Sequence, residues 1–563
     1  MDSSFDYIIV GGGTAGVVIA ARLSQYLPTC KIALVEAGPN AVDHPKVNDV
    51  SDPVAFLKLL QEGLVVDYST TPQEHLDGRT IPNPGGRFLS GSSGANVGNW
   101  MRASAADHEV LAKRAGNERF RFERMVKYFK RVETHFDGAA DGEWYGFDGP
   151  IHTTGGRKYP LREALRESAE KLGHRYDPDA GAKGYQAGLQ DFVQCFRATS
   201  DSTATRQHSA KVYDLSGVEV FCDSPVARII FDAARRATGI ELTSGQKMHA
   251  SKEVIVSCGT QKTPQLLMLS GIGPKDELSK HGISPVVVDA PAVGQNLFDH
   301  AIFTQYFKLK DPSKGLSFPF TGTLRPEYSQ GLPVDFSLFA NIPAADLTPY
   351  LKLDNSPNDD DALLFPKRNH IMTIPFYLPL FPSPALYPSI SATAGTHISL
   401  GALNMLPSSR GTVTLSSRDP SAPPIINPRF LSTHTDRYIM RRAVRANLAL
   451  TSTAPFADEI EGEVAPVDAN PDAKRLSGLS TGSSDEEIDA RLRAAVATVA
   501  HPMGTCALGS VLDGEFRVKG VEGVRVCDAS VFPEPIGAMP SCTVYALAEM
   551  CAEVVSVGGA GSG

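Results

Sequence analysis

A glycine-rich turn between two apolar runs constrains the fold of this chain more than any other feature. Strand-forming residues at 7–10 are followed by Gly11, Gly13 and Gly16 in the spacing G-x-G-x-x-G, and then by a helix-forming stretch. A second β-branched run ends at Glu36. Strand, glycine turn, helix, second strand and terminal acid follow one another in the order of a dinucleotide-binding unit. The sequence therefore predicts a Rossmann-like α/β domain at the N-terminus.

Each residue of this unit has a predicted physical role. Gly11 permits the tight turn, Gly13 lets the backbone approach a pyrophosphate, and Gly16 lets the helix pack closely on the strand. The phosphates would lie at the helix N-terminus, where free N–H groups favour an anion. Glu36 would accept hydrogen bonds from a ribose diol and would repel a 2′-phosphate, which disfavours NADP. FAD and NAD both remain open at this point, and a purely structural glycine turn is the alternative.

Composition limits the remaining possibilities. With 563 residues the chain is too long for one ordinary core, so we expect two large domains or one enzyme with elaborate insertions. A content of 42% hydrophobic and 21% charged residues is typical of a globular protein and excludes disorder. The net charge of -9, without a basic run, argues against nucleic acid or an anionic membrane as the partner. We expect a small-molecule substrate, and the sequence leaves the oligomeric state open.

The cysteines and the N-terminus indicate the compartment. The eight cysteines form no C-x-x-C pair and have no zinc-ligand spacing, so we expect reduced thiols and no metal site. The N-terminus enters a strand at once and shows no cleavable signal, and no apolar run reaches the length of about 18 residues that a membrane span requires. We therefore expect a cytoplasmic protein.

Five further motifs suggest a family. A second glycine-rich loop occupies residues 85–109, and "GTQKTPQLLMLSGIGP" follows a strand-forming run. The segments "VGQNLFDH", "HPMGTC" and "VCDASVFP…TVYALAE" come later in the chain. Together with the N-terminal unit, these motifs resemble those of the glucose-methanol-choline (GMC) oxidoreductases in order and spacing, with Ser90 in place of one glycine of the second loop. The resemblance covers nearly the whole chain.

The resemblance implies FAD as the cofactor and a fold of the α/β class. In this fold a Rossmann-like FAD-binding domain is joined to a second, mixed α+β substrate domain built on an antiparallel-type sheet. The FAD-binding domain would be discontinuous and comprise residues 1–155, 200–300 and 500–563. The substrate domain would comprise residues 156–199 and 301–499.

The resemblance also implies which residues contact FAD. Thr14 and Ala15 would touch the pyrophosphate, Glu36 the adenosine ribose, and Val226 the adenine region. The remaining contacts along the diphosphate, ribityl and isoalloxazine parts would come from Ala37, Leu89, Ser92, Asn96, Val97, Gly98, Asn99, Asp528, Ala529 and Pro540. Some family members attach the flavin covalently through a His in the second glycine loop. The glycine-rich part of this loop, residues 85–99, has no His, so we predict noncovalent FAD.

His501, in "HPMGTC", is the predicted catalytic base. A helix over residues 485–499 would begin with a capping box between Ser484 and Glu487, and Pro502 would end it just before His501. The imidazole would thus leave a helix end beside the flavin. Neutral imidazole can accept a hydroxyl proton near pH 7 while hydride leaves for the flavin. His208 and His300 also lie in family-like segments, and we interpret both as structural residues or as residues behind the site.

Met539 departs from the family pattern. Relatives place His or Asn here, where it makes the second hydrogen bond to the substrate oxygen, whereas Met offers no real hydrogen bond. Three explanations compete: an apolar substrate held by its hydrocarbon body, another side chain such as Asn99 supplying the contact, or a reaction without net hydride transfer. Met539 filling a gap in the core is a fourth, simpler explanation.

We therefore predict an FAD-dependent oxidoreductase that transfers hydride from an alcohol-type substrate with an apolar or aromatic body to the flavin. The context would be intracellular specialised metabolism. The alternative is a redox-neutral flavoprotein (a lyase, cyclase, isomerase or decarboxylase) in which FAD is structural or photochemical, and an FAD-binding protein without catalysis is a third interpretation. The Pro-rich and aromatic-rich stretch 369–390 shows no period, so we expect a surface loop or the wall of an apolar pocket there.

Overall fold

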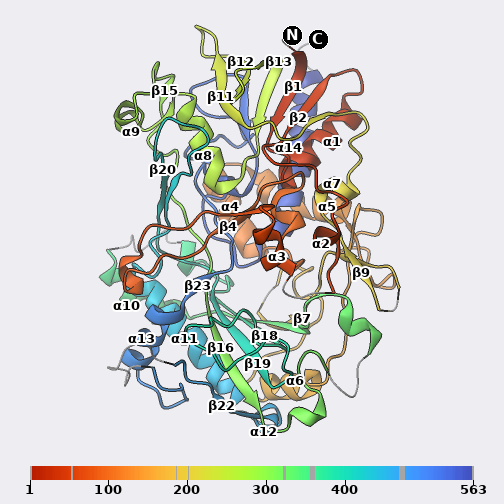
Figure 1. The fold of residues 1–563 in the computed structure, drawn as a ribbon, viewed down its shortest axis with the longest axis vertical. Coiled ribbons are helices and arrows are strands. Elements are labelled where there is room, and N and C mark those ends of the chain that lie inside the picture. The colour runs from red at the N-terminus through yellow and green to blue at the C-terminus, as the bar shows by residue number, and fades with distance from the viewer. Residues whose placement is uncertain are drawn as a thin grey trace.

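Two seven-stranded sheets, one in each half of the molecule, form the framework of the fold (Figure 1). The computed structural model describes residues 3–51, 55–185, 187–200, 202–320, 325–355, 362–467 and 476–560. The halves are stacked along the long axis, and both termini lie at the end formed by β1 and α14 (Figure 1). The chain crosses between the halves more than once, because residues 188–191 belong to the second sheet and precede residues 219–256 of the first.

The first sheet has the predicted Rossmann-like character. Its strand order is β10-β2-β1-β13-β12-β11, and β24 also pairs with β13. β1 runs parallel to β2 and β13, whereas β11 and β12 form an antiparallel hairpin. The strands are β1 (Ser3–Val10), β2 (Ile32–Val35), β10 (Glu219–Phe221), β11 (Val226–Phe231), β12 (Ala237–Leu242), β13 (Lys247–Val256) and β24 (Val524–Val526).

Three helices pack together beside this sheet: α1 (Thr14–Tyr26), α5 (Phe122–Val132) and α14 (Pro540–Ala560). Glu549 of α14 is fully buried, and its carboxylate accepts hydrogen bonds at 2.8 and 2.9 Å from Nε of Arg22 in α1. The hydroxyl group of Tyr213 donates to the same carboxylate at 3.0 Å. Within the described residues, the segment 540–558 has the length and mean hydropathy of a membrane span, but 67% of it is buried in the protein, as in a core helix.

The second sheet is antiparallel throughout, in the order β22-β16-β19-β18-β17-β7, with β23 also paired to β16. The strands are β7 (Gly188–Asp191), β16 (Ala301–Leu309), β17 (Phe336–Ala340), β18 (Ile371–Phe376), β19 (His397–Asn404), β22 (Ile460–Glu463) and β23 (Ala497–Thr498). α11 (His434–Thr451) packs on β18 and β19 from one side. The other side bears an apolar cluster that belongs to the candidate site.

One of the two expectations for the stretch 369–390, a surface loop, was wrong for residues 371–376, which form β18 in the interior of the sheet. All six residues of β18 are buried, so the strand has no polar face and no alternation to reveal it. A separate two-stranded sheet consists of β20 (Thr412–Thr414) and β21 (Ile425–Asn427).

The remaining elements are shorter or peripheral. The helices are α2 (Pro45–Asn48), α3 (Ala55–Gln61), α4 (Ala105–Ala115), α6 (Arg162–Lys171), α7 (Ser209–Val212), α8 (Gly259–Leu269), α9 (Lys275–Lys280), α10 (Ala344–Leu353), α12 (Phe456–Glu459) and α13 (Asp485–Ala495). The short strands are β3 (Val65–Asp67), β4 (Pro84–Gly86), β5 (Glu133–Thr134), β6 (Ile151–His152), β8 (Phe196–Ala198), β9 (Ala204–Arg206), β14 (Ile272–Gly273) and β15 (Val288–Asp289). We keep as a proposal the discontinuous two-domain division given above.

Candidate functional site

The N-terminal glycine turn is shaped by close backbone contacts. A Cβ atom on Gly16 would lie 1.9 Å from the carbonyl oxygen of Gly11, so only glycine allows α1 to pack this closely on β1. Gly11 has a φ of +101°, and a Cβ atom there would lie 2.4 Å from the carbonyl oxygen of Ser257 at the end of β13. The conformation of the turn therefore depends on both glycines.

The same turn has room and donors for a pyrophosphate. A Cβ atom on Gly13 would meet only the Ser257 oxygen, at 3.9 Å, so the space beside Gly13 is open. Gly13 caps α1 without a side-chain hydrogen bond, and the N–H groups of Thr14, Ala15 and Gly16 have no partner within the helix. Free N–H groups at the start of a long helix are a suitable site for a diphosphate.

Glu36 lies at the end of β2 and is buried beneath this turn. Its carboxylate accepts hydrogen bonds from the backbone N–H groups of Gly12 and Gly38, both at 2.8 Å. Burial raises the pKa of Glu36, and these N–H groups oppose the change. Each carboxylate oxygen keeps a second lone pair, which suits the donor hydroxyl groups of a ribose. The free N–H groups at the start of α1 and the acceptor oxygens of Glu36 thus fit the adenosine diphosphate half of FAD.

The second glycine loop is held by Ser90, which stands where the family pattern has glycine. Ser90 has a φ of +111°, in the region that favours glycine, and its side chain compensates by bonding. Its Oγ atom lies 2.7 Å from Nδ1 of His208 and accepts a hydrogen bond from Ala210 N–H at 3.0 Å. Burial lowers the pKa of His208 to about 3, so this ring is neutral. His208 therefore supports the loop through Ser90.

The other predicted FAD-contact residues lie in four parts of the chain. Ala37 follows β2, and Val226 begins β11. Leu89, Ser92, Asn96, Val97, Gly98 and Asn99 belong to the second loop, in which Val97 is 39% exposed. Asp528 and Ala529 follow β24, and Pro540 is the first residue of α14.

The side-chain carboxylate of Asp528 accepts hydrogen bonds from three other residues of the protein. It accepts hydrogen bonds from Gly259 N–H at 2.9 Å, from the Thr263 hydroxyl at 2.6 Å and from Ser530 N–H at 2.7 Å. These bonds join β24 to the start of α8. Any contact of Asp528 with a diphosphate is thus left to its main chain.

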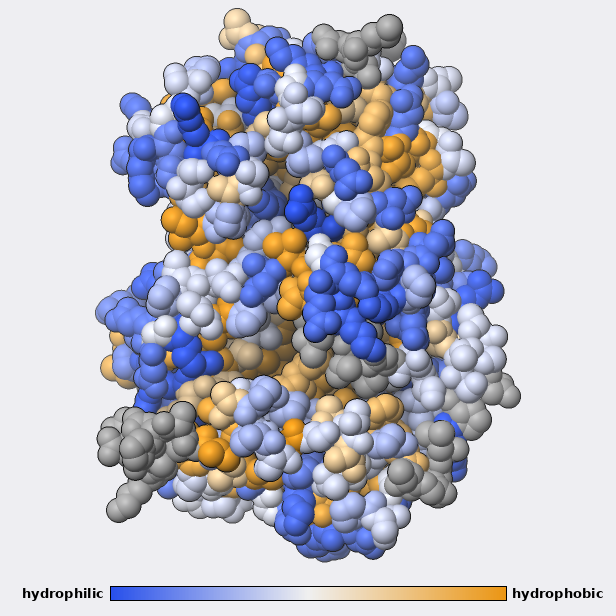
Figure 2. Space-filling model, viewed as in Figure 1, coloured by the Kyte–Doolittle hydropathy of each residue, from blue (hydrophilic) through white to orange (hydrophobic). Residues whose placement is uncertain are grey.

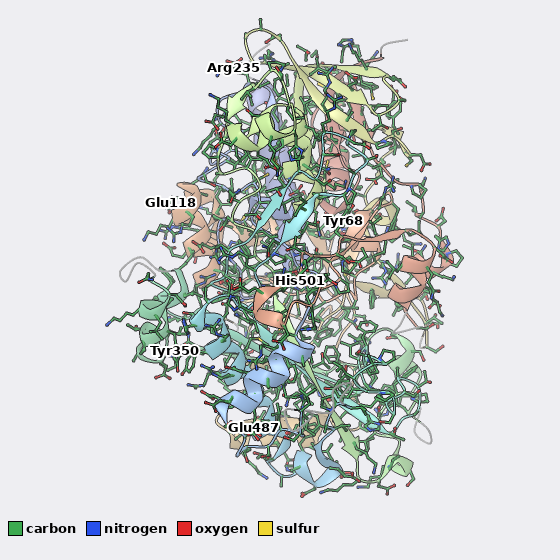
Figure 3. The ribbon with its side chains drawn as sticks, turned by 60° about the vertical axis from the view of Figure 1, so that its left-hand side comes forward. Tyr68, Glu118, Arg235, Tyr350, Glu487 and His501 are labelled. Carbon is green, nitrogen blue, oxygen red and sulfur yellow. The ribbon has the colours of Figure 1, made fainter. Side chains whose placement is uncertain are left out.

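His501 does not lie at a helix exit, which corrects the sequence expectation. The predicted capping box of Ser484 and Glu487 is present, but α13 ends at Ala495. The chain then pairs with β16 as β23 and turns at Ala500, which has a φ of +58°, before it reaches His501. Local sequence favoured a longer helix, but tertiary pairing with β16 overrides it. Figure 3 shows His501 near the middle of the molecule, between the two halves.

The turn that carries His501 is fixed by a buried carboxylate. Asp299 accepts hydrogen bonds from His501 N–H at 3.0 Å, from the Thr498 hydroxyl at 2.6 Å and from the Asn83 amide at 3.1 Å. Thr260 in α8 donates to the carbonyl oxygen of Pro502 at 2.7 Å. Burial raises the pKa of Asp299 to about 7, although the hydrogen bonds that it accepts oppose the change. The base-bearing turn is therefore held by residues of several distant segments.

A second histidine touches the first. Nδ1 of His300 lies 3.2 Å from Nδ1 of His501, and the two rings are nearly perpendicular, at 88°. Nε2 of His501 makes no hydrogen bond within the described residues and is not among their fully buried polar atoms, so it is open to a ligand. Burial and the neighbouring His300 lower the pKa of His501 well below its usual range. Sequence reasoning missed this contact because it joins residues 201 positions apart.

An apolar cluster, which we call the apolar wall, includes Ile302, two residues after His300, and contacts Val499, two residues before His501. Ile302, Leu403, Met372 and Phe339 are cross-strand neighbours in one row over β16, β19, β18 and β17. The full wall consists of Phe192, Ile302, Leu332, Val334, Phe339, Met372, Ile374, Phe376, Leu378, Leu403, Met405 and Met539, with Met101, Phe318, Leu380 and Val499 packed against it. On the face shown in Figure 2, hydrophobic side chains are visible in a hollow at mid-height.

The loop that carries Met539 is anchored by a buried ion pair. Arg368 is 1% exposed, and its Nε atom donates to Asp107 at 2.8 Å. Arg368 also donates to the carbonyl oxygen of Pro535, and the Asp107 carboxylate accepts from Gly537 N–H at 3.1 Å. The Arg368–Asp107 pair thus fixes the loop just before Met539 by hydrogen bonds. Met539 itself is 7% exposed.

Asn99 points toward the same region. Trp100 directs its ring into the first core, where its N–H group donates to Glu133 at 2.9 Å. In an extended segment neighbouring side chains point to opposite sides, so Asn99 and Met101 lie opposite Trp100. Met101 packs on the apolar wall. The Asn99 side chain is buried, and neither its oxygen nor its nitrogen has a hydrogen-bond partner in the part of the chain that the structure describes.

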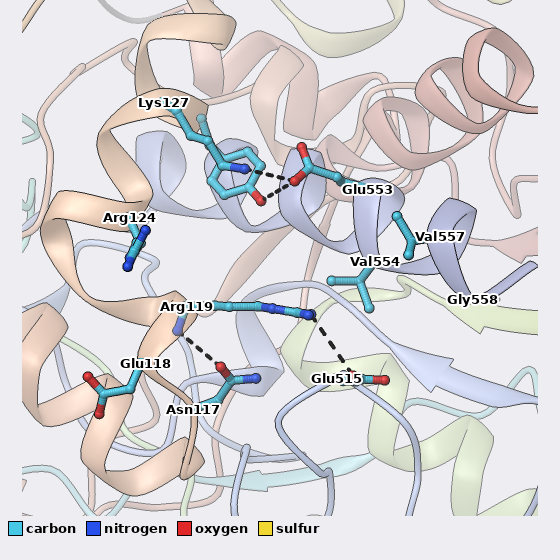
Figure 4. Close-up of a pocket in the computed structure, with 11 residues that line it drawn as sticks. Asn117, Glu118, Arg119, Arg124, Lys127, Glu515, Glu553, Val554, Val557 and Gly558 are labelled. Carbon is cyan, nitrogen blue, oxygen red and sulfur yellow. Dashed lines mark hydrogen bonds and ion pairs between the residues drawn. The ribbon is translucent and has the colours of Figure 1, made fainter. Parts of the chain in front are cut away.

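A separate pocket of about 490 Å³ lies on the outside of the first half, between α5 and the end of α14 (Figure 4). It is lined by charged side chains that pair with each other, such as Lys127 with Glu553 at 2.8 Å. It has no contact with His501. Over the described ranges, no group of three or more His, Cys, Asp or Glu side chains could hold a metal ion.

Known proteins resemble the chain along its full length. A sequence profile described as GMC oxidoreductase matches residues 5–302, and a second with the same description matches residues 407–548. The chain is 36% identical to the GMC-type oxidoreductase acuG of Aspergillus aculeatus over 99% of both chains. It is 31% identical to choline oxidase of Arthrobacter globiformis, over 100% of this chain and 96% of the relative. A solved structure of formate oxidase from Aspergillus oryzae is similar with a TM-score of 0.85 at 27% identity, over 99% of both chains.

Proposed function

The chain belongs to the GMC oxidoreductase family, whose members bind FAD, and on this premise we propose that it oxidises an alcohol-type substrate with an apolar or aromatic body. One observation carries the proposal. His501 has an Nε2 atom without a hydrogen bond, and Val499, two residues before it, packs against the apolar wall, so a base and a hydrocarbon surface come from the same short segment.

In the proposed reaction the protein accepts one proton, that of the substrate hydroxyl group. The substrate hydroxyl group gives its proton to Nε2 of His501, the C–H bond on the same carbon breaks with its electron pair, and a carbon–oxygen double bond forms. Bound FAD supplies the acceptor of the hydride, and so of both electrons. Because the pKa of His501 is lowered, the ring is neutral near pH 7 and its lone pair is free, but the same shift makes it a weaker base than an exposed imidazole.

Three parts of the first half would hold FAD. Glu36 would bind the ribose diol, the first turn of α1 the pyrophosphate, and the loop from Leu89 to Asn99 the flavin end. We propose that the cofactor is noncovalent, because residues 85–99 of the second glycine loop contain no His, and His108 in α4 is buried with its Nδ1 atom 2.8 Å from the carbonyl oxygen of Phe120. Acid precipitation should then release the yellow colour into the supernatant, whereas a coloured pellet would show a covalent bond.

The apolar wall favours a substrate with an apolar body. Its residues bear no charge, and a substrate group of Leu, Ile, Met or Phe size would gain about 1.5–3 kcal/mol on full burial. Gly401 lies between them, where a Cβ atom would come within 3.0 Å of Ile302. The hydrocarbon or aromatic part of a substrate would therefore pack here, and a cationic or strongly polar alcohol would be disfavoured.

Asn99 is the proposed second hydrogen-bond partner of the substrate oxygen. Met539 leaves that oxygen without the usual partner, and a buried amide with both atoms unpaired is costly unless a ligand satisfies it. Its orientation on the side of Met101 supports this role. The simpler view, that Met539 only fills space, predicts no kinetic effect at Asn99.

A redox-neutral reaction is the second candidate, and Met539 is the observation that favours it. Loss of a group that stabilises developing charge costs roughly 10²- to 10³-fold in rate. Such a loss disfavours hydride transfer and leaves His501 able to move protons in a lyase, cyclase, isomerase or decarboxylase reaction. In that case FAD would be structural or photochemical.

One anaerobic experiment separates the two candidates. The purified holoprotein is mixed with benzylic and long-chain primary alcohols, with small polar alcohols as controls, and visible flavin absorbance is followed. Bleaching by the apolar alcohols supports the proposal, and His501→Ala should slow bleaching by about 10²-fold or more. Product formation with the flavin oxidised throughout would instead establish the redox-neutral reaction.

A further inference from the structure

Two polar side chains lie on the same face of the second sheet as the apolar wall. Gln190 of β7 and Ser337 of β17 are directly opposite each other in the antiparallel pairing of these strands, so their side chains share a face. Side chains alternate between the two faces of a strand, and Phe339, two residues after Ser337, belongs to the wall. Phe336 and Leu338 belong to a different core cluster. Gln190 and Ser337, which we call the polar pair, therefore lie on the wall face.

Each side chain of the polar pair has a buried polar atom that the protein does not satisfy. Ser337 is completely buried, and Gln190 is 4% exposed. Within the ranges that the structure describes, Oγ of Ser337 and Nε2 of Gln190 have no hydrogen-bond partner. A Cβ atom on Gly181 would lie 2.6 Å from Oε1 of Gln190, so this loop encloses the oxygen end of the amide and not the nitrogen end. Because burying an unpaired hydroxyl or amide is costly, these two atoms indicate a ligand.

Another serine on the wall face shows the contrasting case. Ser399 of β19 lies four residues before Leu403 of the wall and therefore on the same face. Its hydroxyl group donates to the carbonyl oxygen of Leu378 at 2.8 Å and accepts from Leu380 N–H at 3.0 Å. Ser399 thus supports the fold through the backbone, whereas Ser337 has no such role.

The polar pair lies far across the sheet from the proposed base. His501 is at the β16 side, because β23, which ends three residues before it, pairs with β16. The order β16-β19-β18-β17 places Ser337 three strands away from Ile302 of β16. With strands about 4.8 Å apart, this separation is roughly 14 Å. Leu403 and Met372 of the wall lie on the two strands between. A substrate with its hydroxyl group at His501 and its body along the wall therefore directs its other end to the polar pair.

The polar pair offers hydrogen-bond donors and carries no charge. Nε2 of Gln190 has two N–H groups, and the Ser337 hydroxyl group can also donate. The Cβ atoms of directly opposite residues in paired strands are about 5 Å apart, so both side chains can reach one oxygen atom. A carboxylate would be buried against two neutral groups, which is costly, and a neutral oxygen avoids this cost. The group that fits is therefore a neutral acceptor such as a carbonyl oxygen.

We propose that the polar pair is a second substrate-binding site, which binds a carbonyl group at the end of the apolar substrate body remote from the reacting carbon. This inference rests on the proposed function, because it places the substrate hydroxyl group at His501. The apolar wall provides contact area without direction. Hydrogen bonds to Gln190 and Ser337 would determine which end of the substrate meets the base.

Matched substrates test the predicted preference. Long-chain primary alcohols with one keto group toward the far end are compared with the same chains in which CH₂ replaces the carbonyl, by anaerobic flavin reduction. The keto alcohol whose carbonyl reaches the polar pair should have a kcat/KM about 10-fold higher than its plain counterpart. Moving the carbonyl along the chain should reveal one best position. A wall without a polar site would disfavour the keto group at every position, and that result would overturn the proposal.

Three variants test whether the preference comes from the polar pair. Ser337→Ala and Gln190→Met remove a hydrogen-bonding group with little change in size. Each should lower the preference for the keto alcohol by about 3-fold or more and leave the rate with the plain alcohol nearly unchanged. Ser399→Ala is the control, since it removes a hydroxyl group that is bonded to the protein. It should lower the denaturation midpoint and leave the preference intact. An equal loss of preference in Ser399→Ala and Ser337→Ala would show a general effect on the sheet and contradict the proposal.

Equilibrium binding separates failure of this inference from failure of the proposed function. If no alcohol bleaches the flavin, the oxidase proposal fails, and the same alcohols then serve as unreactive ligands of the holoprotein. Tighter calorimetric binding of the keto alcohol that is lost in Ser337→Ala would still support the polar pair, and equal Kd values would overturn it. If the flavin bleaches at equal rates with keto and plain alcohols, the oxidase proposal stands and the inference about the polar pair fails.

Discussion

Met539 is 7% exposed and belongs to the apolar wall, at the position where the family resemblance implies His or Asn. A polar amide there would restore the second hydrogen bond. Met539→Asn should therefore raise the rate of flavin reduction by small alcohols, by about 10-fold or more. Stopped-flow absorbance under anaerobic conditions measures it.

Met539→Leu is the control, because it has similar size without an amide. It should leave the rate with small alcohols unchanged. If the Asn variant gains no more than the Leu variant, the missing hydrogen bond does not limit the reaction, and Met539 acts through packing.

The acid limb of the pH profile should report Asp299 and not His501. The pKa of Asp299 is raised to about 7, whereas those of His300 and His501 are lowered, so of these three groups only Asp299 titrates near neutrality. As the pH falls through this value, Asp299 gains a proton and loses acceptor capacity for His501 N–H or Thr498. The reduction rate should fall with it. In Asp299→Asn the limb should disappear from the rate profile, and a limb at the unchanged pH would assign the titration to another group.

Residue-level prediction succeeds where the constraint is local. The spacing of Gly11 and Gly16 and the acid at Glu36 follow from covalent geometry and short-range contacts, and the structure gives each of them close neighbours of the expected kind. The contact between His300 and His501 could not be predicted in this way. It depends on the pairing of two segments far apart in the chain, and no local pattern specifies that pairing.

At the scale of elements, amphipathic and capped segments were predictable and fully buried ones were not. The capping box of α13 and the hairpin of β11 and β12 can be read from sequence because half of each element faces solvent. β18 is buried on both faces and reads as featureless. β23 has only two residues and exists because β16 offers it a partner, so the sequence alone favours a longer α13.

The helix α14 provides an element-level prediction. Glu549→Gln leaves Arg22 beside a neutral, buried amide and should lower the free energy of unfolding by about 3 kcal/mol. Glu553→Gln on the same helix is the control. Glu553 pairs with Lys127 at the surface, where its side chain is 33% exposed, so this change should cost about 1 kcal/mol or less. Thermal denaturation of the holoproteins compares them, and equal midpoints would show that the buried pair contributes nothing.

At the scale of the whole molecule, the ion pair of Arg368 and Asp107 joins the two halves. Arg368 precedes β18 of the second sheet, and Asp107 lies in α4 and also supports the loop before α14. Arg368→Met should leave a buried carboxylate unpaired, at a cost of about 3–5 kcal/mol, and should loosen flavin retention. Flavin release on heating and the denaturation midpoint measure both effects.

Arg442→Met provides the comparison for this prediction. Arg442 pairs with Asp346 at the surface, where the side chains are 41% and 42% exposed, so its loss should be nearly neutral. If Arg368→Met and Arg442→Met release flavin at the same temperature, the buried pair does not hold the halves together.

The turn that carries His501 has one further consequence. Through β23 it pairs with β16 of the second sheet. The Thr260 hydroxyl, which donates to Pro502, and the backbone bonds from Gly504 and Cys506 to residues 529 and 530 join it to the first half. A hinge motion that parted the halves would carry the base away from its own position. We therefore expect substrate to enter by movements of single side chains, without separation of the halves. If the substrate is an alcohol as proposed, two alcohols of equal affinity would then differ in rate when one enters more slowly than the other.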